Sequence, residues 1–174
     1  MHPIMSRFLA RSSPLAPGLL LVCSLLMATP AAAAPTGEFD WPLRPRPAVL
    51  RPFDKPPQNW LPGHRGVDLA GSPGQQVLAA GAGIVVFAGK VATKPVVSID
   101  HPGGLRTTYE PVTASIPVGR RVSRSTSIGA LEPGHDGCPA PACLHWGLRR
   151  HHDYLDPLAL LRQAPIRLKP LSPD

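Results

Sequence analysis

The most informative segment of this 174-residue chain is Gly63-His64-Arg65-Gly66-Val67-Asp68-Leu69-Ala70. It places an imidazole and a carboxylate four residues apart, and Gly66 between them permits a turn that lets both side chains converge on one ion. A second stretch, Cys143-Leu144-His145-Trp146-Gly147, alternates so that Cys143, His145 and Gly147 would share one face of a strand. Two imidazoles and one carboxylate, with a fourth position left to water, form the ligand set of a catalytic zinc site. A His-x-x-x-Asp pair on its own is common on protein surfaces, so the surrounding sequence has to decide between the two interpretations.

Short apolar runs, separated by glycine and proline, occupy most of the chain after this stretch. This pattern predicts an all-β domain of antiparallel strands. The predicted strands are Gln76–Ala80, Gly83–Ala88, Val96–Asp100, Leu105–Tyr109, Ser127–Leu131 and Cys143–Leu148. His101-Pro102-Gly103-Gly104 predicts a hairpin between the third and fourth of these runs. Only Tyr154–Arg162 predicts a short helix.

The ordered motifs resemble those of the lysostaphin-type zinc endopeptidases, the LytM domain family. The resemblance runs from Phe53 to Leu161. It is carried by Gly63–Ala70, by Gly74, Val77, Ala79-Ala80, Gly81, Gly83 and Val85, by Val97–His101, Gly104-Leu105, Thr108-Tyr109, Val118-Gly119, Val122 and Ile128-Gly129, and by Leu144-His145-Trp146 and Asp156-Pro157-Leu158. It implies an antiparallel β-sheet or sandwich-like core, of the duplicated hybrid type, with a groove that holds the metal. It also implies a peptidase that cleaves peptide bonds of peptidoglycan, with Zn²⁺ bound by His64, Asp68 and His145.

Two residues depart from the family pattern. The resemblance places assisting histidines beside the metal at the positions that Cys143 and Pro111 occupy in this chain. Because general acid–base assistance is worth about 10²–10⁴ in rate, their replacement implies slow turnover.

Three explanations of these departures stay open. Glu110 acts as the base; or His135, His151 or His152 reaches the metal from a loop; or the domain is an inactive module that binds cell wall or activates another hydrolase. The loop histidines are otherwise expected to be solvated.

The two ends of the chain are expected to differ from the domain. Arg7 and Arg11, an apolar run at 19–27 and the alanines at 31–34 have the order of a secretory signal peptide over residues 1–34. We expect a proline-rich lead-in over 35–50, a metallopeptidase domain over 51–162 and a tail over 163–174. The expected location is therefore outside the cytoplasm, in the periplasm or associated with the cell wall.

Cys138 and Cys143 are expected to form a disulfide, because this is the default for two cysteines in an oxidising compartment. A metal pair is the rival interpretation. The bond would tie the loop before His145 and remove Cys143 from any role as ligand or nucleophile.

The formal net charge of +7 predicts partners only weakly. The arginines are scattered and no basic run interleaves with aromatic residues, so we expect no nucleic-acid binding. Weak attraction to anionic cell-wall polymers or membrane surfaces is the favoured interpretation of the charge. We expect a monomer that acts on peptidoglycan peptides, with no membrane span once the signal is removed.

Three further side chains have structural interpretations. His101, which precedes Pro-Gly-Gly, is interpreted as a turn residue, and Trp146 as part of the core. Trp60 either flanks the groove or packs in the core.

Overall fold

A computed structural model of the protein describes residues 39–161. The expected signal peptide at 1–34 and the expected tail at 163–174 lie outside the described residues. Within residues 39–161, no helix is long and apolar enough to cross a membrane.

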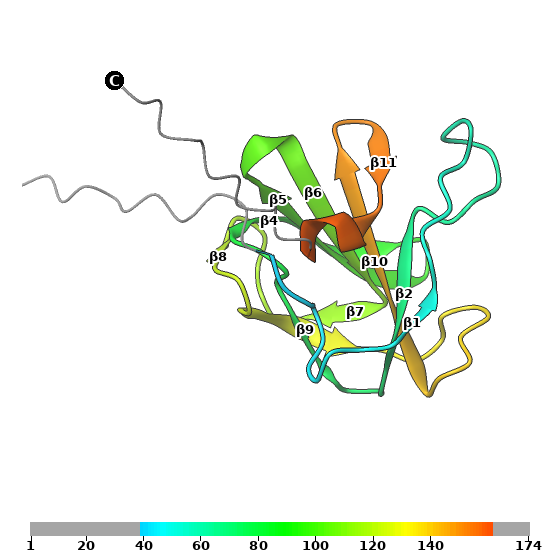
Figure 1. The fold of residues 1–174 in the computed structure, drawn as a ribbon. Coiled ribbons are helices and arrows are strands. Elements are labelled where there is room, and N and C mark those ends of the chain that lie inside the picture. Colours follow the sequence, from blue (N-terminus) through cyan, green and yellow to red (C-terminus); the bar gives the residue numbers. More distant parts are fainter. Residues whose placement is uncertain (1–38, 162–174) are drawn as a thin grey trace, which may run out of the picture. The chain divides into compact units, whose positions relative to one another are not determined.

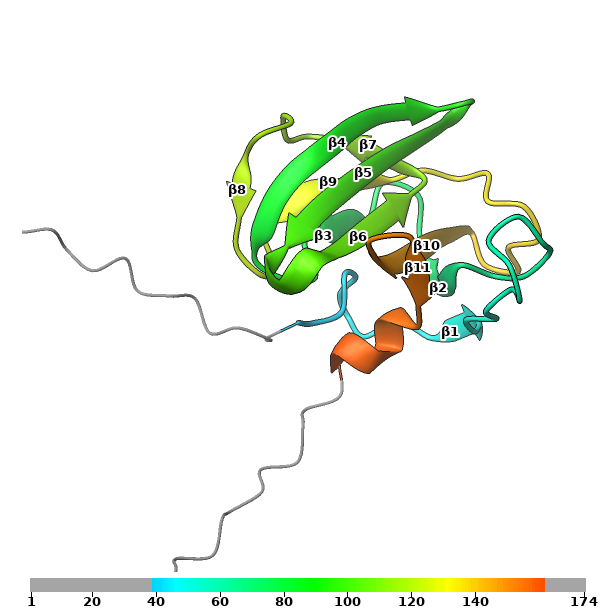
Figure 2. The ribbon, with the colours of Figure 1, turned by 90° about the horizontal axis from the view of Figure 1, so that it is seen from above.

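The described chain forms two antiparallel β-sheets, which confirms the predicted fold class (Figure 1). The larger sheet has the order β1-β2-β10-β6-β5-β4-β8, and β11 pairs with the end of β10. The smaller sheet has the order β3-β9-β7 and lies against the larger one (Figure 2). The strands are β1 (Val49–Arg51), β2 (Gly66–Gly71), β3 (Gln76–Leu78), β4 (Gly83–Val91), β5 (Lys94–His101), β6 (Leu105–Glu110), β7 (Val112–Ala114), β8 (Arg121–Val122), β9 (Ser127–Leu131), β10 (Ala142–Arg150) and β11 (Asp153–Leu155).

All six predicted strands are present, and the predicted hairpin joins β5 to β6 through the 3₁₀ turn η1 (Pro102–Gly104). Strand β10 is central to the larger sheet. It pairs with β6 along one edge, and with β2 and then β11 along the other.

One buried apolar cluster is shared by the two sheets. Side chains of β2, β5, β6 and β10 contribute to it from the larger sheet, and β3, β7 and β9 contribute from the smaller one. Trp146 and Tyr109 are its largest fully buried members, and they are direct partners across β10 and β6. The prediction that Trp146 belongs to the core is confirmed.

The proline-rich lead-in is extended but packs closely on the domain. Leu43 is fully buried, and Phe39 and Trp41 pack against the core. The N–H of Leu78 donates to the carbonyl of Pro42 at 2.9 Å. Because β1 spans residues 49–51, the expected domain boundary at 51 falls inside a strand.

The segment predicted as a helix at 154–162 folds differently. Residues up to Leu155 continue the sheet as β11, and only the 3₁₀ turn η2 (Pro157–Leu161) follows. Asp156 favours this start because its Oδ1 accepts the N–H of Leu158 at 2.9 Å. Leu158, Leu160 and Leu161 then pack against the core, so burial and not helix propensity sets the conformation.

Candidate metal centre

The site is assembled by the register of the larger sheet. Asp68 on β2 and Glu110 on β6 are the direct partners of His145 on β10. Directly opposed residues of antiparallel strands point to the same face, so the three side chains form one row. The next row contains Val67, Trp146 and Tyr109, which are fully buried on the core side. Alternation along β10 therefore separates the site from the core, as the sequence predicts.

His64 reaches this row from the loop before β2. Its backbone forms an isolated antiparallel bridge with Asp54, with hydrogen bonds of 2.8 and 3.0 Å. The ring is buried, and its Nδ1 lies 2.7 Å from the carbonyl oxygen of Pro52. Since a carbonyl only accepts, Nδ1 carries the proton and Nε2 of the neutral ring carries a lone pair.

The three expected ligand atoms converge tightly. His64 Nε2 lies 3.0 Å from Asp68 Oδ1 and 3.1 Å from His145 Nδ1. His145 Nδ1 lies 2.9 Å from the same Asp68 oxygen. When the ring is neutral, the Nε2 lone pair of His64 faces a carboxylate oxygen, and a cation between the two atoms stabilises this arrangement. One carboxylate and two imidazoles, each contributing one atom, fit a divalent ion such as zinc, with room for further ligands.

The ionisation of Asp68 also suits a cation site. Burial alone would raise its pKa, but the hydrogen bond from His145 and the proximity of His135 and His64 outweigh burial. Together they hold the Asp68 pKa well below its usual range. The carboxylate is therefore charged at neutral pH and available as a ligand.

Gly66 serves the site differently from the sequence-based expectation of a flexible turn. It is the first residue of β2, and a Cβ there would lie 2.5 Å from the carbonyl oxygen of Trp146 and 2.7 Å from His145 Nε2. The glycine is needed because strand β10 and the His145 ring approach the backbone this closely.

The other predicted site residues are placed as follows. Glu110 shares the row with His145, and its Oε1 lies 3.6 Å from Lys94 Nζ. Cys138 and Cys143 are joined as a disulfide with Cα atoms 5.7 Å apart. His151 and His152 are exposed, in agreement with the solvated interpretation. Trp60 is 78% exposed, so its core interpretation is wrong.

His135 is the residue that sequence reasoning underweighted, because it was expected to be solvated. It lies on the loop between β9 and β10, and its Nε2 is 3.0 Å from Asp68 Oδ1. Its ring centroid is 5.9 Å from that of His145, and its side chain is only 12% exposed. The available signal was its position three residues before Cys138, which the expected disulfide ties to Cys143 on the strand that carries His145.

A groove adjoins the cluster on the same face of the sheet. It has a volume of about 440 Å³. It is lined by Arg65, Val91, Thr108, Glu110, His145, Gly147, Leu148, Arg149 and Tyr154. Arg65 is held in place because its guanidinium donates to the carbonyls of Asn59 and Leu61 and lies 5.6 Å from the centroid of the Tyr154 ring. The groove therefore brings His145 and Glu110 of the site row into one open depression with Arg65 and Arg149.

A second histidine is buried elsewhere, and the interpretation of His101 as a turn residue is wrong. It ends β5 with its side chain inward, where Nδ1 donates to the Ala82 carbonyl at 2.8 Å and Nε2 lies 2.7 Å from Thr107 Oγ1. Thr107 in turn bonds the Tyr109 hydroxyl at 2.9 Å. Burial lowers the pKa of His101 and raises that of Tyr109 to about 12, so both stay neutral.

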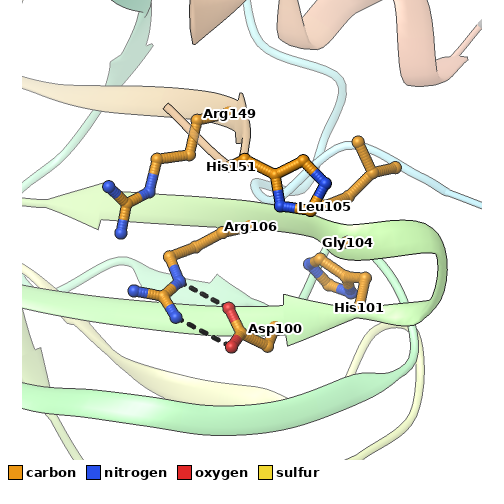
Figure 3. Close-up of a pocket in the computed structure, with 7 residues that line it drawn as sticks. All are labelled: Asp100, His101, Gly104, Leu105, Arg106, Arg149 and His151. Atoms are coloured by element: carbon orange, nitrogen blue, oxygen red, sulfur yellow. Dashed lines mark hydrogen bonds and ion pairs between the residues drawn. The ribbon is translucent and has the colours of Figure 1, made fainter. Parts of the chain in front are cut away.

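Figure 3 shows the small cavity of about 230 Å³ beside His101, with Arg106 bound through two contacts to Asp100. Both partners lie on the outer face of the sheet, and Arg106 holds the pKa of Asp100 below its ordinary value. The carboxylate of this cavity is thus already paired with a guanidinium, and Arg149 adds a further positive charge to the lining.

Comparisons with known proteins agree with this geometry. Residues 62–157 match the model of the family described as Peptidase family M23. The uncharacterized protein Rv2891 of Mycobacterium tuberculosis is 57% identical over 160 residues, which are 90% of this chain and 64% of that protein. The chain therefore spans less than two thirds of this relative's length.

Two solved structures show the same fold. A chain of the SpoIIQ–SpoIIIAH pore-forming complex has a TM-score of 0.61 at 22% identity, with 71% of this chain and 90% of that chain covered. A zinc-containing peptidase from Vibrio cholerae has a TM-score of 0.59 at 19% identity, with 73% and 40% covered.

Proposed function

We propose, from the premise that the chain belongs to peptidase family M23, that it is a zinc-dependent endopeptidase acting on the peptides of peptidoglycan. The observation that carries the proposal is the convergence of His64 Nε2, Asp68 Oδ1 and His145 Nδ1 within 3.1 Å of one another. Bound zinc in such a site would polarise the scissile carbonyl and lower the pKa of a bound water to about 7.

The chain's own residues hold this site in place. The hydrogen bond to Pro52 fixes the tautomer and orientation of His64, as outer-shell partners of metal-binding histidines commonly do. The pairing of β2 with β10 fixes Asp68 against His145. The groove beside His145 would receive a substrate peptide, and besides Glu110 its lining carries two positive charges, those of Arg65 and Arg149. Those charges suit a substrate that carries free carboxylates.

We also propose that the protein works outside the cytoplasm as a monomer. The order of basic, apolar and small residues over 1–34 supports export, and a disulfide between Cys138 and Cys143 suits an oxidising compartment. One copy contributes all three donor side chains, which supports the monomer. Mass determination of the exported protein and light scattering test both points: a retained residue 1, or a stable dimer, contradicts them.

A second candidate is an inactive module that binds cell wall or activates another hydrolase. It is favoured by the absence of histidine at positions 111 and 143, where the resemblance expects assisting imidazoles. Its structural similarity to a chain found in the SpoIIQ–SpoIIIAH complex is compatible with a binding role.

The first experiment measures zinc per purified protein and the release of new amino termini from isolated peptidoglycan. We expect one zinc and measurable release, with both lost in His64→Ala and both retained in the exposed-histidine control His152→Ala. Zinc binding without release, combined with retention on sedimented cell wall, would favour the inactive module. Absence of zinc from the wild-type protein after incubation with the metal contradicts the proposal.

A further inference from the structure

His135 occupies an environment that suits a ligand site more than a structural role. Its Nε2 approaches Asp68 Oδ1 at 3.0 Å, and both ring nitrogens are shielded from solvent. Within residues 39–161, neither nitrogen has a hydrogen-bond partner of good geometry. A buried donor or acceptor without a hydrogen bond costs about 1–3 kcal/mol of folding free energy. The position of the His135 ring therefore lowers the stability of the domain.

The loop that carries His135 is fastened at two places. Near its start, the N–H of Glu132 donates to the carbonyl of Pro111 at 3.0 Å. Near its end, Cys138 is bonded to Cys143, which lies on β10 two residues before His145. Between these points the N–H of Cys138 donates to the carbonyl of His135 at 3.2 Å, which closes a turn beside the ring.

These two fastening points are the two positions at which the family resemblance expects an assisting histidine. Pro111 supplies the carbonyl and Cys143 supplies the sulfur that hold the loop. The carbonyl is a backbone group that any residue at 111 would supply, so only the cysteine at 143, through its disulfide, adds a side-chain constraint that holds the His135 loop against the cluster.

We propose that His135 is the assisting imidazole of the metal site, delivered by the loop in place of the histidines absent at 111 and 143. The inference rests on the proposed function. In this role the His135 imidazole acts on the reacting peptide beside the three ligands, and it does not coordinate the metal.

The other candidates fit this role less well. His151 and His152 are exposed and lie on the turn between β10 and β11. Glu110 has Lys94 Nζ at 3.6 Å, and the same ammonium group lies 3.6 Å from Asp136, the residue after His135. The Glu110 side chain thus has a cationic neighbour, whereas His135 has the Asp68 carboxylate beside its Nε2 and no hydrogen-bond partner of good geometry within residues 39–161.

The test replaces His135 with Ala and uses His152→Ala as the matched control. We expect zinc content to stay at the wild-type level, and kcat on peptidoglycan peptides to fall about 10²–10⁴-fold with little change in KM. The visible absorption of Co²⁺ loaded in place of zinc should change in His135→Ala and not in His152→Ala. Loss of metal comparable to that of His64→Ala would overturn the proposal in favour of a fourth ligand.

Removal of the disulfide provides a second, independent test of the role of His135. The double variant Cys138→Ser/Cys143→Ser should bind zinc and lose most of the same turnover, because the loop is released. Adding His135→Ala to that background should then have little further effect, since both changes remove one interaction. Full additivity of the two effects would contradict a shared mechanism.

The two proposals fail in different ways. If the wild-type protein binds zinc but cleaves no wall peptide, the proposed function fails and the Co²⁺ spectra still decide whether His135 stands at the metal. If the wild-type protein is active and His135→Ala matches it in turnover and Co²⁺ absorption, only the inference about His135 is overturned.

Discussion

The domain buries two groups of polar side chains, and they differ in how their hydrogen bonds are satisfied. In the group formed by His101, Thr107 and Tyr109, both nitrogens of the histidine have partners within the protein. In the cluster of His64, Asp68 and His145, Nδ1 of His64 donates to a carbonyl, while its Nε2, His145 Nδ1 and Asp68 Oδ1 converge on one point. A satisfied network stabilises a core, whereas converging imidazole nitrogens and a carboxylate oxygen suit a bound cation. The comparison shows why burial of a histidine alone does not identify a functional site.

The largest expected difference between the two groups is their response to metal. Zinc at a thousandfold excess over its dissociation constant should raise the free energy of unfolding by about 4 kcal/mol, because it binds only the folded state. The gain should vanish in His64→Ala and persist in His101→Gln, measured by urea unfolding with zinc and with a chelator. An equal gain in both variants would remove the distinction between the groups.

A smaller difference is expected from two glycines that are partners across β2 and β10. Gly66→Ala would force a Cβ within 2.7 Å of His145 Nε2, whereas the nearest atom to a Cβ at Gly147 is the Arg65 carbonyl oxygen at 3.5 Å. We expect Gly66→Ala to cost about 1–3 kcal/mol and to weaken zinc binding, since overpacking displaces the strand. Gly147→Ala should stay close to wild type in both measurements. Equal effects would show that clearance around His145 does not limit the site.

The smallest effect concerns the pH dependence of stability. Burial lowers the pKa of His101 in the folded protein, so this histidine binds a proton more readily in the unfolded chain. The free energy of unfolding therefore decreases as the pH falls from about 6.5, the pKa of an unperturbed histidine, towards the lower pKa of folded His101. The contribution of one group is at most about 1.4 kcal/mol per pH unit. Metal-free wild type and His101→Gln should therefore differ in the acid slope of their unfolding free energy. A common slope, with His152→Gln as the exposed control, would contradict this.

Much of the fold can be predicted from the sequence, because short apolar runs and the glycines that separate them are local signals. The six predicted strands and the hairpin before Leu105 are of this kind. β1, β7 and β8 have two or three residues each, so their pairing depends on neighbours and not on their own pattern. The 3₁₀ turn after Asp156 was predicted as a helix because its leucines have the spacing of one, although tertiary packing determines the outcome.

The site was only partly predictable for a similar reason. The motif indicates His64, Asp68 and His145, and the structure brings all three together. His135 lies on a loop whose path depends on a disulfide and on a hydrogen bond to Pro111. The disulfide is predicted from the sequence, whereas the backbone hydrogen bond to Pro111 has no local sequence signal. The burial of His101 was missed because its partners are 6 and 19 residues away.

The position of β10 near the end of the chain has a consequence for biogenesis. His145 lies 77 residues after Asp68 and 81 after His64, and it pairs with Asp68 only once β10 has joined the sheet. A nascent chain that ends before Ala142 holds only two of the three donors, whatever the structure of its earlier strands. If the site binds zinc as proposed, coordination by all three donors has to await the pairing of β10 with β2, and zinc uptake during synthesis or refolding would report that pairing step.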